Sequence, residues 1–317
     1  MMAARVLVTG ASGQIGSELV PRLQEIHGRD AVFPTVFPPE AGKGLPWKAD
    51  VLDVDDRPAL DRALKDTGAT EVYHLGGILS ATGEKSPDLA WRVNLQGLKN
   101  VLDAAMAARV PRVFWPSSIA VFGPDAPKSM TPQNTPRNPT TMYGVTKVAG
   151  ELLCTYYFTR YGFDVRSVRY PGVISSEAPP GGGTTDYAVA MFYSALKGER
   201  YSCFVTKETT LPMMYMADAL RACTDLMAAP AEKVRLHSGY NLAAVSFKAG
   251  DLEKAIRRRI PGFRVDYAPD SRQQIADSWP RSIDDSRARA DWGWRHEYDL
   301  SKMTDVMLQR LKARRAA

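Results

Sequence analysis

Cysteine is scarce in this sequence, and long hydrophobic stretches are lacking. The 317 residues include only three cysteines, which lie far apart and form neither a CxxC pair nor a cluster with histidine: Cys154, Cys203 and Cys223. We therefore expect no disulfide framework and no bound metal. No uncharged apolar run approaches the roughly 18–20 residues of a membrane span, and the opening MMAARVLVTG enters a strand pattern without a signal-peptide core. These absences predict a cytoplasmic protein without a membrane partner.

A strong excess of one charge is also lacking. The net charge is +6, and basic residues are densest in two short clusters, RRRIPGFR at 257–264 and LKARRAA at 311–317. Such clusters favour a solvated basic face over an interface with nucleic acid, so we expect no nucleic-acid partner. The hydrophobic content of 44% is enough for a large core, either in one α/β domain or in a nucleotide domain with a smaller companion.

The first half alternates β-branched runs with helical patterns, which predicts an α/β, doubly wound parallel-sheet Rossmann fold. We assign residues 1–172 to a nucleotide-binding domain, to which parts of 200–245 return. Residues 173–317 form mainly a smaller, partly interleaved substrate-binding domain. The sequence predicts strands at 4–10, 31–37, 71–76, 112–118 and 164–170, and helices at 14–28, 57–68, 86–108, 141–161 and 300–314.

Three glycines follow the first predicted strand and open the first helix: Gly10, Gly13 and Gly16. Glycines at this spacing allow a tight turn, through which the backbone approaches a pyrophosphate at the positive end of the helix. Plain turns also use such glycines. Their place between strand and helix favours nucleotide binding.

A second group of residues carries reactive side chains. Ser117 and Ser118 end a predicted strand, and Tyr143 and Lys147 lie four residues apart on the next helix, so they share one face. A nearby ammonium favours the phenolate of tyrosine and makes it a usable base. An isolated YxxxK is usually an ordinary amphipathic helix. The strand-end serine and the glycine turn in the same chain argue for a catalytic site.

These motifs together resemble the extended short-chain dehydrogenase/reductase family across essentially the whole chain. The resemblance rests on the glycine turn, on HLGGI from His74, VNLQG with Asn94, SSIAVFG, YGVTK and ADWGWRHEYDL. Within the family, LSATGE, RYPGVISSEAPPGGGTTDYAV, LPMMYM and IADSWP resemble the L-threonine 3-dehydrogenase branch. The resemblance implies NAD as cofactor and oxidation of the C3 hydroxyl of L-threonine to 2-amino-3-oxobutanoate.

The resemblance also implies roles for individual residues. Tyr143 is the expected general base, Lys147 lowers its pKa and holds the nicotinamide ribose, and Asn94 supports a water relay behind Lys147. Ser118 orients the substrate oxygen; the branch often has threonine there, and serine keeps the hydroxyl. The expected cofactor contacts are Gly10, Ser12, Gly13, Gln14, Ile15, Gly16, Asp50, Val51, Leu75, Gly76, Gly77, Asn94, Tyr143, Lys147, Tyr170, Pro171 and Val173.

The substrate, a small zwitterion, needs a compact polar pocket. The expected substrate contacts are Ser80, Ser118, Tyr143, Thr184, Thr185, Asp186 and Trp279. Asp186 is a candidate partner for the ammonium group, although it could equally cap a helix that starts at Tyr187. Trp279 taken alone would more often belong to the core.

Two other functions share part of this pattern. A sugar-nucleotide epimerase or dehydratase would have the same glycines, Ser118, Tyr143 and Lys147. Dehydratases of this family usually carry an Asp-Glu pair where this chain has Ile119 and Ala120. A non-catalytic dinucleotide sensor would not need the intact Ser-Tyr-Lys set. The helices at 141–161 and 87–108 resemble those that pair in family dimers, so a homodimer is expected.

The predicted second strand lacks the acid that usually holds the adenosine ribose, because Val36 stands where related chains carry a carboxylate. NAD binding should therefore be weakened but not abolished. No arginine replaces the acid and Lys43 is the only nearby cation, so a preference for NADP is not expected. Pro34 has no N–H and should interrupt the sheet ladder, with a locally distorted strand end.

Overall fold

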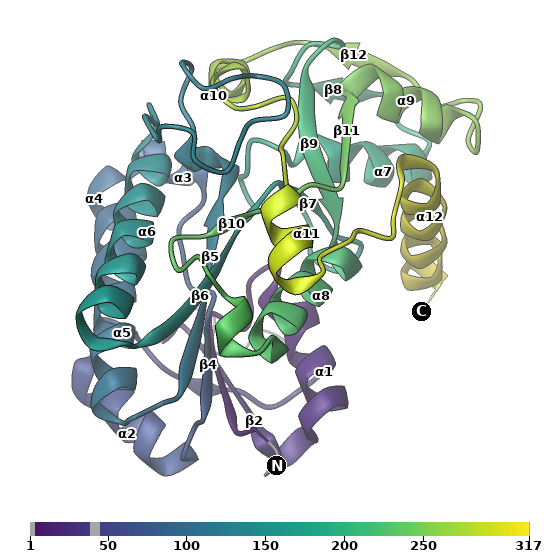
Figure 1. The fold of residues 1–317 in the computed structure, drawn as a ribbon. Helices are drawn as coiled ribbons and strands as arrows, with labels where there is room; N and C mark the ends of the chain where they lie inside the picture. The colour runs from purple at the N-terminus through teal and green to yellow at the C-terminus, as the bar shows by residue number, and fades with distance from the viewer. Residues whose placement is uncertain (1–3, 39–44, 317) are drawn as a thin grey trace.

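A central parallel sheet organises the computed structural model, which describes residues 4–38 and 45–316 (Figure 1). Its seven strands run in the order β10-β6-β5-β4-β1-β2-β3, and every neighbouring pair is parallel. This order places β1 beside β4 and confirms the predicted doubly wound fold. The strands are β1 (Val6–Thr9), β2 (Val32–Val36), β3 (Asp50–Val51), β4 (Glu71–His74), β5 (Arg112–Ser118), β6 (Asp164–Tyr170) and β10 (Tyr240–Asn241).

Helices cover both faces of this sheet. The side chains of β1 point alternately to the two faces, and all of them are buried. Val6 and Val8 pack into one apolar cluster with α1 (Gly16–His27) and α8 (Met216–Ala228). Leu7 points the other way, into a cluster with the helices α2 (Arg57–Thr67), α5 (Gly97–Ala107) and α6 (Met142–Tyr161). Successive strand residues face opposite sides, so the four residues of β1 contribute side chains to two hydrophobic clusters. None of the helices in the described ranges is long and apolar enough to cross a bilayer.

A second, smaller part lies beyond the carboxyl ends of the central strands, at the top of Figure 1. It contains a three-stranded sheet, β11-β9-β7, and a two-stranded sheet, β12-β8. The chain then returns to the central sheet through α8 and β10. The remaining elements are β7 (Gly172–Ile174), β8 (Tyr201–Cys203), β9 (Thr210–Tyr215), β11 (Val245–Lys248), β12 (Val265–Tyr267), α7 (Tyr187–Lys197), α9 (Ala249–Arg257), α10 (Arg272–Ser278), α11 (Ser286–Trp292) and α12 (Leu300–Ala316).

The long helix expected at 86–108 is not a regular α-helix. It consists of α4 (Pro87–Trp91), a π-helical turn (Arg92–Gln96) and α5. The extra residue of a π turn displaces one side chain from the regular helical face. Here the turn holds Asn94, whose amide oxygen accepts the N–H of Ile78 at 2.7 Å. A separate short helix that the sequence analysis did not predict, α3 (Ser80–Lys85), precedes it.

Pro34 does not interrupt the sheet, so the predicted break in the ladder is wrong. The register between β2 and β1 runs without a gap, and Pro34 lies opposite Val8. The carbonyl of Thr35 accepts a hydrogen bond from the N–H of Ala11 on the β1 side. Because backbone groups alternate along a strand, the nitrogen of Pro34 faces the opposite side. There β3 begins to pair only at Thr35, so no ladder bond is lost.

Candidate functional site

One cleft opens where β1, β4, β5 and β6 end, between the central sheet and the smaller part of the structure. Most of the residues predicted to bind cofactor or substrate line it, although they come from distant parts of the sequence. They are Gln14, Ile15, Leu75, Gly77, Ser80, Ser118, Tyr143, Lys147, Tyr170, Pro171, Val173, Thr184, Thr185, Asp186 and Trp279. Ligands of open α/β sheets bind at this edge.

The glycine turn is held by very close backbone packing. Gly10 has φ = 71°, and a Cβ atom there would lie 2.6 Å from the nitrogen of Gly76. A Cβ on Gly16 would lie 2.6 Å from the carbonyl oxygens of Gly10 and Ala11. Neither position accommodates a side chain. Gly76 therefore supports the turn instead of lining the cleft, and Gly16 allows α1 to start against β1.

The start of α1 offers backbone donors to an anion. Gly13 is exposed at the turn, beside Ser12. Within the described ranges, the N–H groups of Gln14 and Ile15 have no hydrogen-bond acceptor. Free N–H groups at the positive end of a helix fit a pyrophosphate, so this end of the cleft suits a dinucleotide. The side-chain amide of Gln14 donates to the carbonyl of Val173 at 3.3 Å and links the two parts of the structure.

Tyr143 lies in the first turn of α6, which is fixed from two sides. The Thr141 hydroxyl caps the helix by accepting the N–H of Gly144, and the Glu84 carboxylate of α3 accepts the N–H of Met142 at 2.7 Å. Burial raises the pKa of Tyr143 to about 12, and a hydrogen bond with Ser118 acts in the opposite direction. Tyr143 and Ser118 thus both line the cleft, and their catalytic roles stay predictions.

Lys147 is buried under the same cleft. Its Nζ donates to the carbonyl of Pro116 at 2.6 Å and lies 4.5 Å from the centroid of the Trp115 ring. Burial lowers the pKa of Lys147 to about 7. The expected lowering of the Tyr143 pKa by Lys147 is not seen, because burial dominates both groups and Nζ is directed at Pro116. Nζ nevertheless remains 5.5 Å from the centroid of the Tyr143 ring.

Asn94 and the residues of β3 do not line the cleft. The Asn94 amide donates to the Ile78 carbonyl at 3.1 Å and to the Thr146 hydroxyl at 3.2 Å, which ties it to the helix turn before Lys147. Asp50 and Val51 are exposed on β3, beside the end of β2. Their predicted contact with adenine and the predicted water relay through Asn94 stay predictions.

The end of β2 is apolar. Val36 is 3% exposed and packs in the same cluster as Val32 and Leu19, whereas Phe37 is exposed. In the described part of this region, the end of β2 therefore presents no carboxylate. Lys43, the cation expected nearby, lies outside the described residues.

The loop before α7 forms the small, polar end of the cleft. The hydroxyls of Ser80 and Thr184 are 3.1 Å apart and both buried, so they bridge α3 and this loop. Asp186 accepts the N–H groups of Gly182 and Gly183, each at 2.8 Å. The helix α7 starts at Tyr187, as the capping alternative required, and Asp186 is its N-cap residue, but the Asp186 side chain makes no capping hydrogen bond. Its predicted contact with an ammonium group stays a prediction.

The sequence analysis missed several residues of this region. Leu79 and Ile119 also line the cleft, next to the predicted Ser80 and Ser118. More important is Glu151, a fully buried acid on α6 that binds two arginines. It follows Lys147 by four residues, so the same helical spacing that linked Tyr143 with Lys147 could have indicated it.

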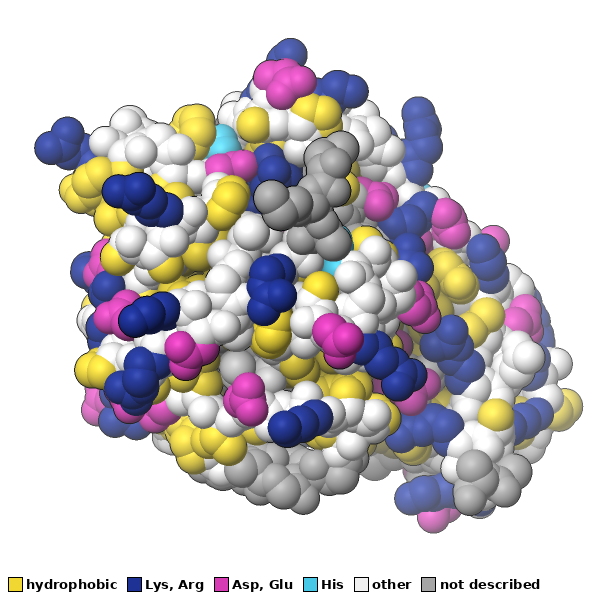
Figure 2. All heavy atoms as spheres, turned by 90° about the horizontal axis from the view of Figure 1, so that it is seen from below, with side chains coloured by type: hydrophobic (Ala, Val, Ile, Leu, Met, Phe, Trp, Pro, Cys, Tyr) yellow, Lys and Arg dark blue, Asp and Glu magenta, His cyan; other side chains and the backbone are white. Residues whose placement is uncertain are grey.

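Charges on the protein surface are mixed. On the face shown in Figure 2, lysine and arginine side chains are interspersed with aspartate and glutamate. The expected lack of a nucleic-acid partner stays a prediction. In residues 4–38 and 45–316, no three His, Cys, Asp or Glu side chains gather as a metal site would require.

Known proteins of similar sequence or structure extend over nearly the whole chain. An uncharacterized epimerase/dehydratase of Staphylococcus haemolyticus is 47% identical and is aligned over 97% of this chain and 98% of its own. The L-threonine dehydrogenase from Cupriavidus necator, in its holo form, is 50% identical with a TM-score of 0.94, covering 97% and 99% of the two chains. The L-threonine dehydrogenase from Clostridium difficile is 44% identical with a TM-score of 0.95, and the match covers 99% of each of the two chains. Residues 6–243 match the NAD dependent epimerase/dehydratase family, to which this chain therefore belongs.

Proposed function

We propose that the protein is an L-threonine 3-dehydrogenase that uses NAD. The observation that carries this proposal is the cleft itself, where Ser118, Tyr143 and Lys147 meet a small polar end built by Ser80 and Thr184. Its hydroxyls suit a zwitterion of the size of an amino acid. Several structurally similar proteins that are about 50% identical in sequence are L-threonine dehydrogenases, which supports L-threonine as the substrate of this chain.

The chemistry of the site requires removal of a proton and a hydride from the substrate carbinol. The Ser118 hydroxyl orients the substrate oxygen, and Tyr143 takes its proton as general base. Lys147, when protonated, stabilises the resulting phenolate. NAD, when bound at the glycine turn and Lys147, supplies the acceptor for the hydride from C3. The product, 2-amino-3-oxobutanoate, is a β-keto acid and should lose carbon dioxide to give aminoacetone.

A sugar-nucleotide epimerase or dehydratase is the second candidate, because the family includes such enzymes. The side chains that follow Ser118 argue against a dehydratase. Ile119 and Ala120 are buried and apolar where dehydratases usually carry an acidic pair. An epimerase would need cationic groups for a nucleoside diphosphate, whereas the glycine-rich loop before α7 closes the cleft with hydroxyls.

Initial rates test the proposed reaction. L-Threonine, its diastereomers and serine are each mixed with the protein and either NAD or NADP, and absorbance is followed at 340 nm. Net NADH formation is expected from L-threonine, because its C3 hydroxyl can reach Tyr143 and Ser118. An epimerase would give no net NADH. The absence of reaction with every amino acid would refute the proposed function.

Tyr143→Phe tests the general base. The variant should bind NAD as the wild type does but lose at least about a hundredfold in kcat, because no group remains to take the proton. Stopped-flow rates and NAD titration by fluorescence measure the two effects. Tyr161→Phe is the control, since Tyr161 lies exposed at the end of the same helix. A fully active Tyr143→Phe enzyme would contradict the assignment.

Val36→Asp tests the missing ribose contact. A carboxylate that accepts ribose hydroxyls contributes about 1.5–3 kcal/mol, roughly ten- to a hundredfold in affinity. We therefore expect a lower KM for NAD and a poorer rate with NADP, whose phosphate the new charge repels. Phe37→Asp places the same charge on the next, exposed residue. Equal effects of the two variants, or an unchanged NAD/NADP ratio in Val36→Asp, would show that Val36 does not lie at the ribose.

We also propose that two copies of the chain pair through α6 and the helical segment at 87–108, which begins with α4. Trp91, Leu152 and Tyr156 are about half exposed and line a shallow groove between these helices. Exposed apolar side chains grouped in this way mark protein interfaces.

Leu152→Asp tests the dimer. It should convert the dimer to a monomer in light scattering, because a charge would be buried in the contact. Met130→Asp, at another exposed apolar residue outside the groove, should leave the dimer intact. A wild-type protein that is monomeric at every concentration would rule the dimer out.

A further inference from the structure

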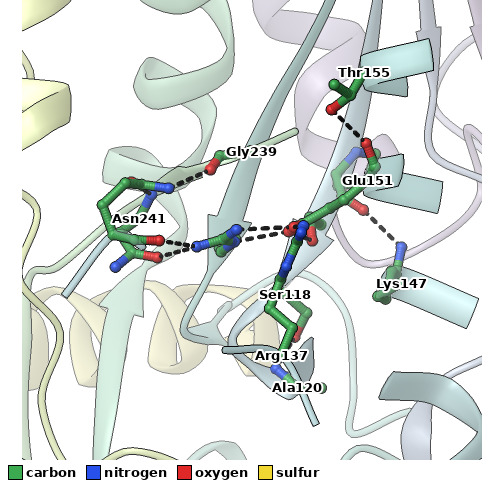
Figure 3. A network of polar contacts seen from close by, with 12 residues as sticks. Ser118, Ala120, Arg137, Lys147, Glu151, Thr155, Gly239 and Asn241 are labelled. Atoms are coloured by element: carbon green, nitrogen blue, oxygen red, sulfur yellow. Dashed lines mark hydrogen bonds and ion pairs between the residues drawn. The ribbon is translucent and has the colours of Figure 1, made fainter. Parts of the chain in front are cut away.

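A buried ionic cluster lies directly behind the cleft. We define the Glu151 cluster as Glu151, Arg137, Arg169 and Ser117. Figure 3 shows Glu151 and Arg137 within this network, with Asn241 on its far side. The Glu151 carboxylate accepts hydrogen bonds from Arg169 at 2.7 and 2.8 Å, from Arg137 at 2.6 Å and from Ser117 at 2.6 Å. All of these donors lie far from Glu151 in sequence.

Burying the charges of this cluster costs free energy, and hydrogen bonds between its members offset that cost. Glu151 is 0% exposed and Arg169 is 3% exposed. A charge in the interior is tolerated when it is paired and its remaining hydrogen-bond groups are satisfied. Arg169 directs its third donor group to the carbonyl of Gln133 and the side-chain oxygen of Asn241. Three segments of the chain, at Ser117, Arg137 and Arg169, are thus fixed to one carboxylate.

Three members of the cluster adjoin a residue of the cleft. Ser117 precedes Ser118 at the end of β5, and Arg169 precedes Tyr170 at the end of β6. Glu151 lies one helical turn beyond Lys147. Neighbouring strand residues point to opposite sides, so the Ser117 hydroxyl is directed at Glu151 and the Ser118 side chain is directed away from it, although both residues lie at the edge of the cleft. A displacement of Ser117 would therefore be transmitted directly to Ser118.

We propose that Glu151 is a positioning residue that, through Ser117, fixes the end of β5 and so holds the Ser118 hydroxyl in place beside Tyr143. The Ser117 hydroxyl is the link between the buried charge and the reacting groups. This inference rests on the proposed dehydrogenase function, because its kinetic test needs turnover of L-threonine.

The link can be removed without breaking the cluster. A change at Glu151 itself would leave the buried Arg169 and the partly buried Arg137 without their carboxylate, and the protein would be strongly destabilised for that reason alone. Ser117→Ala removes one hydroxyl and leaves both arginines paired. The free energy of unfolding should change little beyond the loss of one hydrogen bond, which urea denaturation monitors.

Kinetics of Ser117→Ala give the first readout. We expect kcat to fall about tenfold or more, because a small displacement of a catalytic hydroxyl is enough for such losses. The KM for L-threonine and the affinity for NAD should change less than about threefold, since the Ser117 hydroxyl is buried against Glu151 and the side chains predicted to bind the two ligands are retained. Ser117→Thr, which retains the hydroxyl, should restore most of the activity.

The pH profile gives a second readout that a purely structural role would not move. The rate rises with pH as Tyr143 becomes able to accept a proton, and the hydrogen bond from Ser118 lowers the pKa of Tyr143. Loss of that bond therefore shifts the rising part of the kcat profile to higher pH. Ser117→Ala should show this shift in the same direction as Ser118→Ala.

Ser167→Ala is the matched control. Ser167 is a buried serine on β6, and within the described residues its hydroxyl has no hydrogen-bond partner. Its removal should change neither kcat nor the pH profile. An unshifted profile and unchanged kcat in Ser117→Ala would overturn the proposal, as would equal losses in Ser167→Ala.

A crystal structure of Ser117→Ala separates this inference from the proposed function. If the wild-type protein does not oxidise L-threonine, the proposed function fails, but the position of Ser118 can still be compared between the two structures. A Ser118 side chain displaced from Tyr143 supports the positioning role. A Ser118 side chain that keeps its place overturns it.

Discussion

The close packing of α6 against β5 is the constraint on which the site depends. Gly150 makes it possible, because a Cβ at this position would lie 2.4 Å from the Trp115 ring. At this short distance the Lys147 ammonium reaches the carbonyl of Pro116 and the face of Trp115. The same approach sets Tyr143 beside the end of β5. A larger residue at 150 would move Lys147 and Tyr143 away from the strand.

Burial gives the two ionisable groups of the site opposite shifts. It favours the neutral form of each, so the pKa of Tyr143 rises to about 12 while that of Lys147 falls to about 7. Both shifts have one physical cause, the loss of solvent around a buried charge. A protonated Lys147 and an ionised Tyr143 stabilise each other, so each charge forms more easily when the other is present.

Local patterns in the sequence predicted the sheet, the glycine turn and the group formed by Ser118, Tyr143 and Lys147. Each depends on residues close in the chain or on strand ends that share one edge. The π turn, the loop contacts of Asp186 and the Glu151 cluster were not predicted, because their hydrogen bonds depend on backbone paths that the sequence does not specify. Glu151 binds Ser117 across 34 positions of the chain. Pro34 was misjudged because strand alternation, not composition, determines which side its nitrogen faces.

The orientation of Pro34 also affects the hydrogen bonding of a buried stretch of backbone. Within the described chain, β3 pairs with β2 only at Thr35 and Val36, so the first part of β2 has no strand partner on that side. Pro34 is nevertheless buried, and an unpaired backbone N–H in a buried position costs free energy. Proline has no N–H, so the side of β2 that lacks a partner strand leaves no donor unsatisfied at this position.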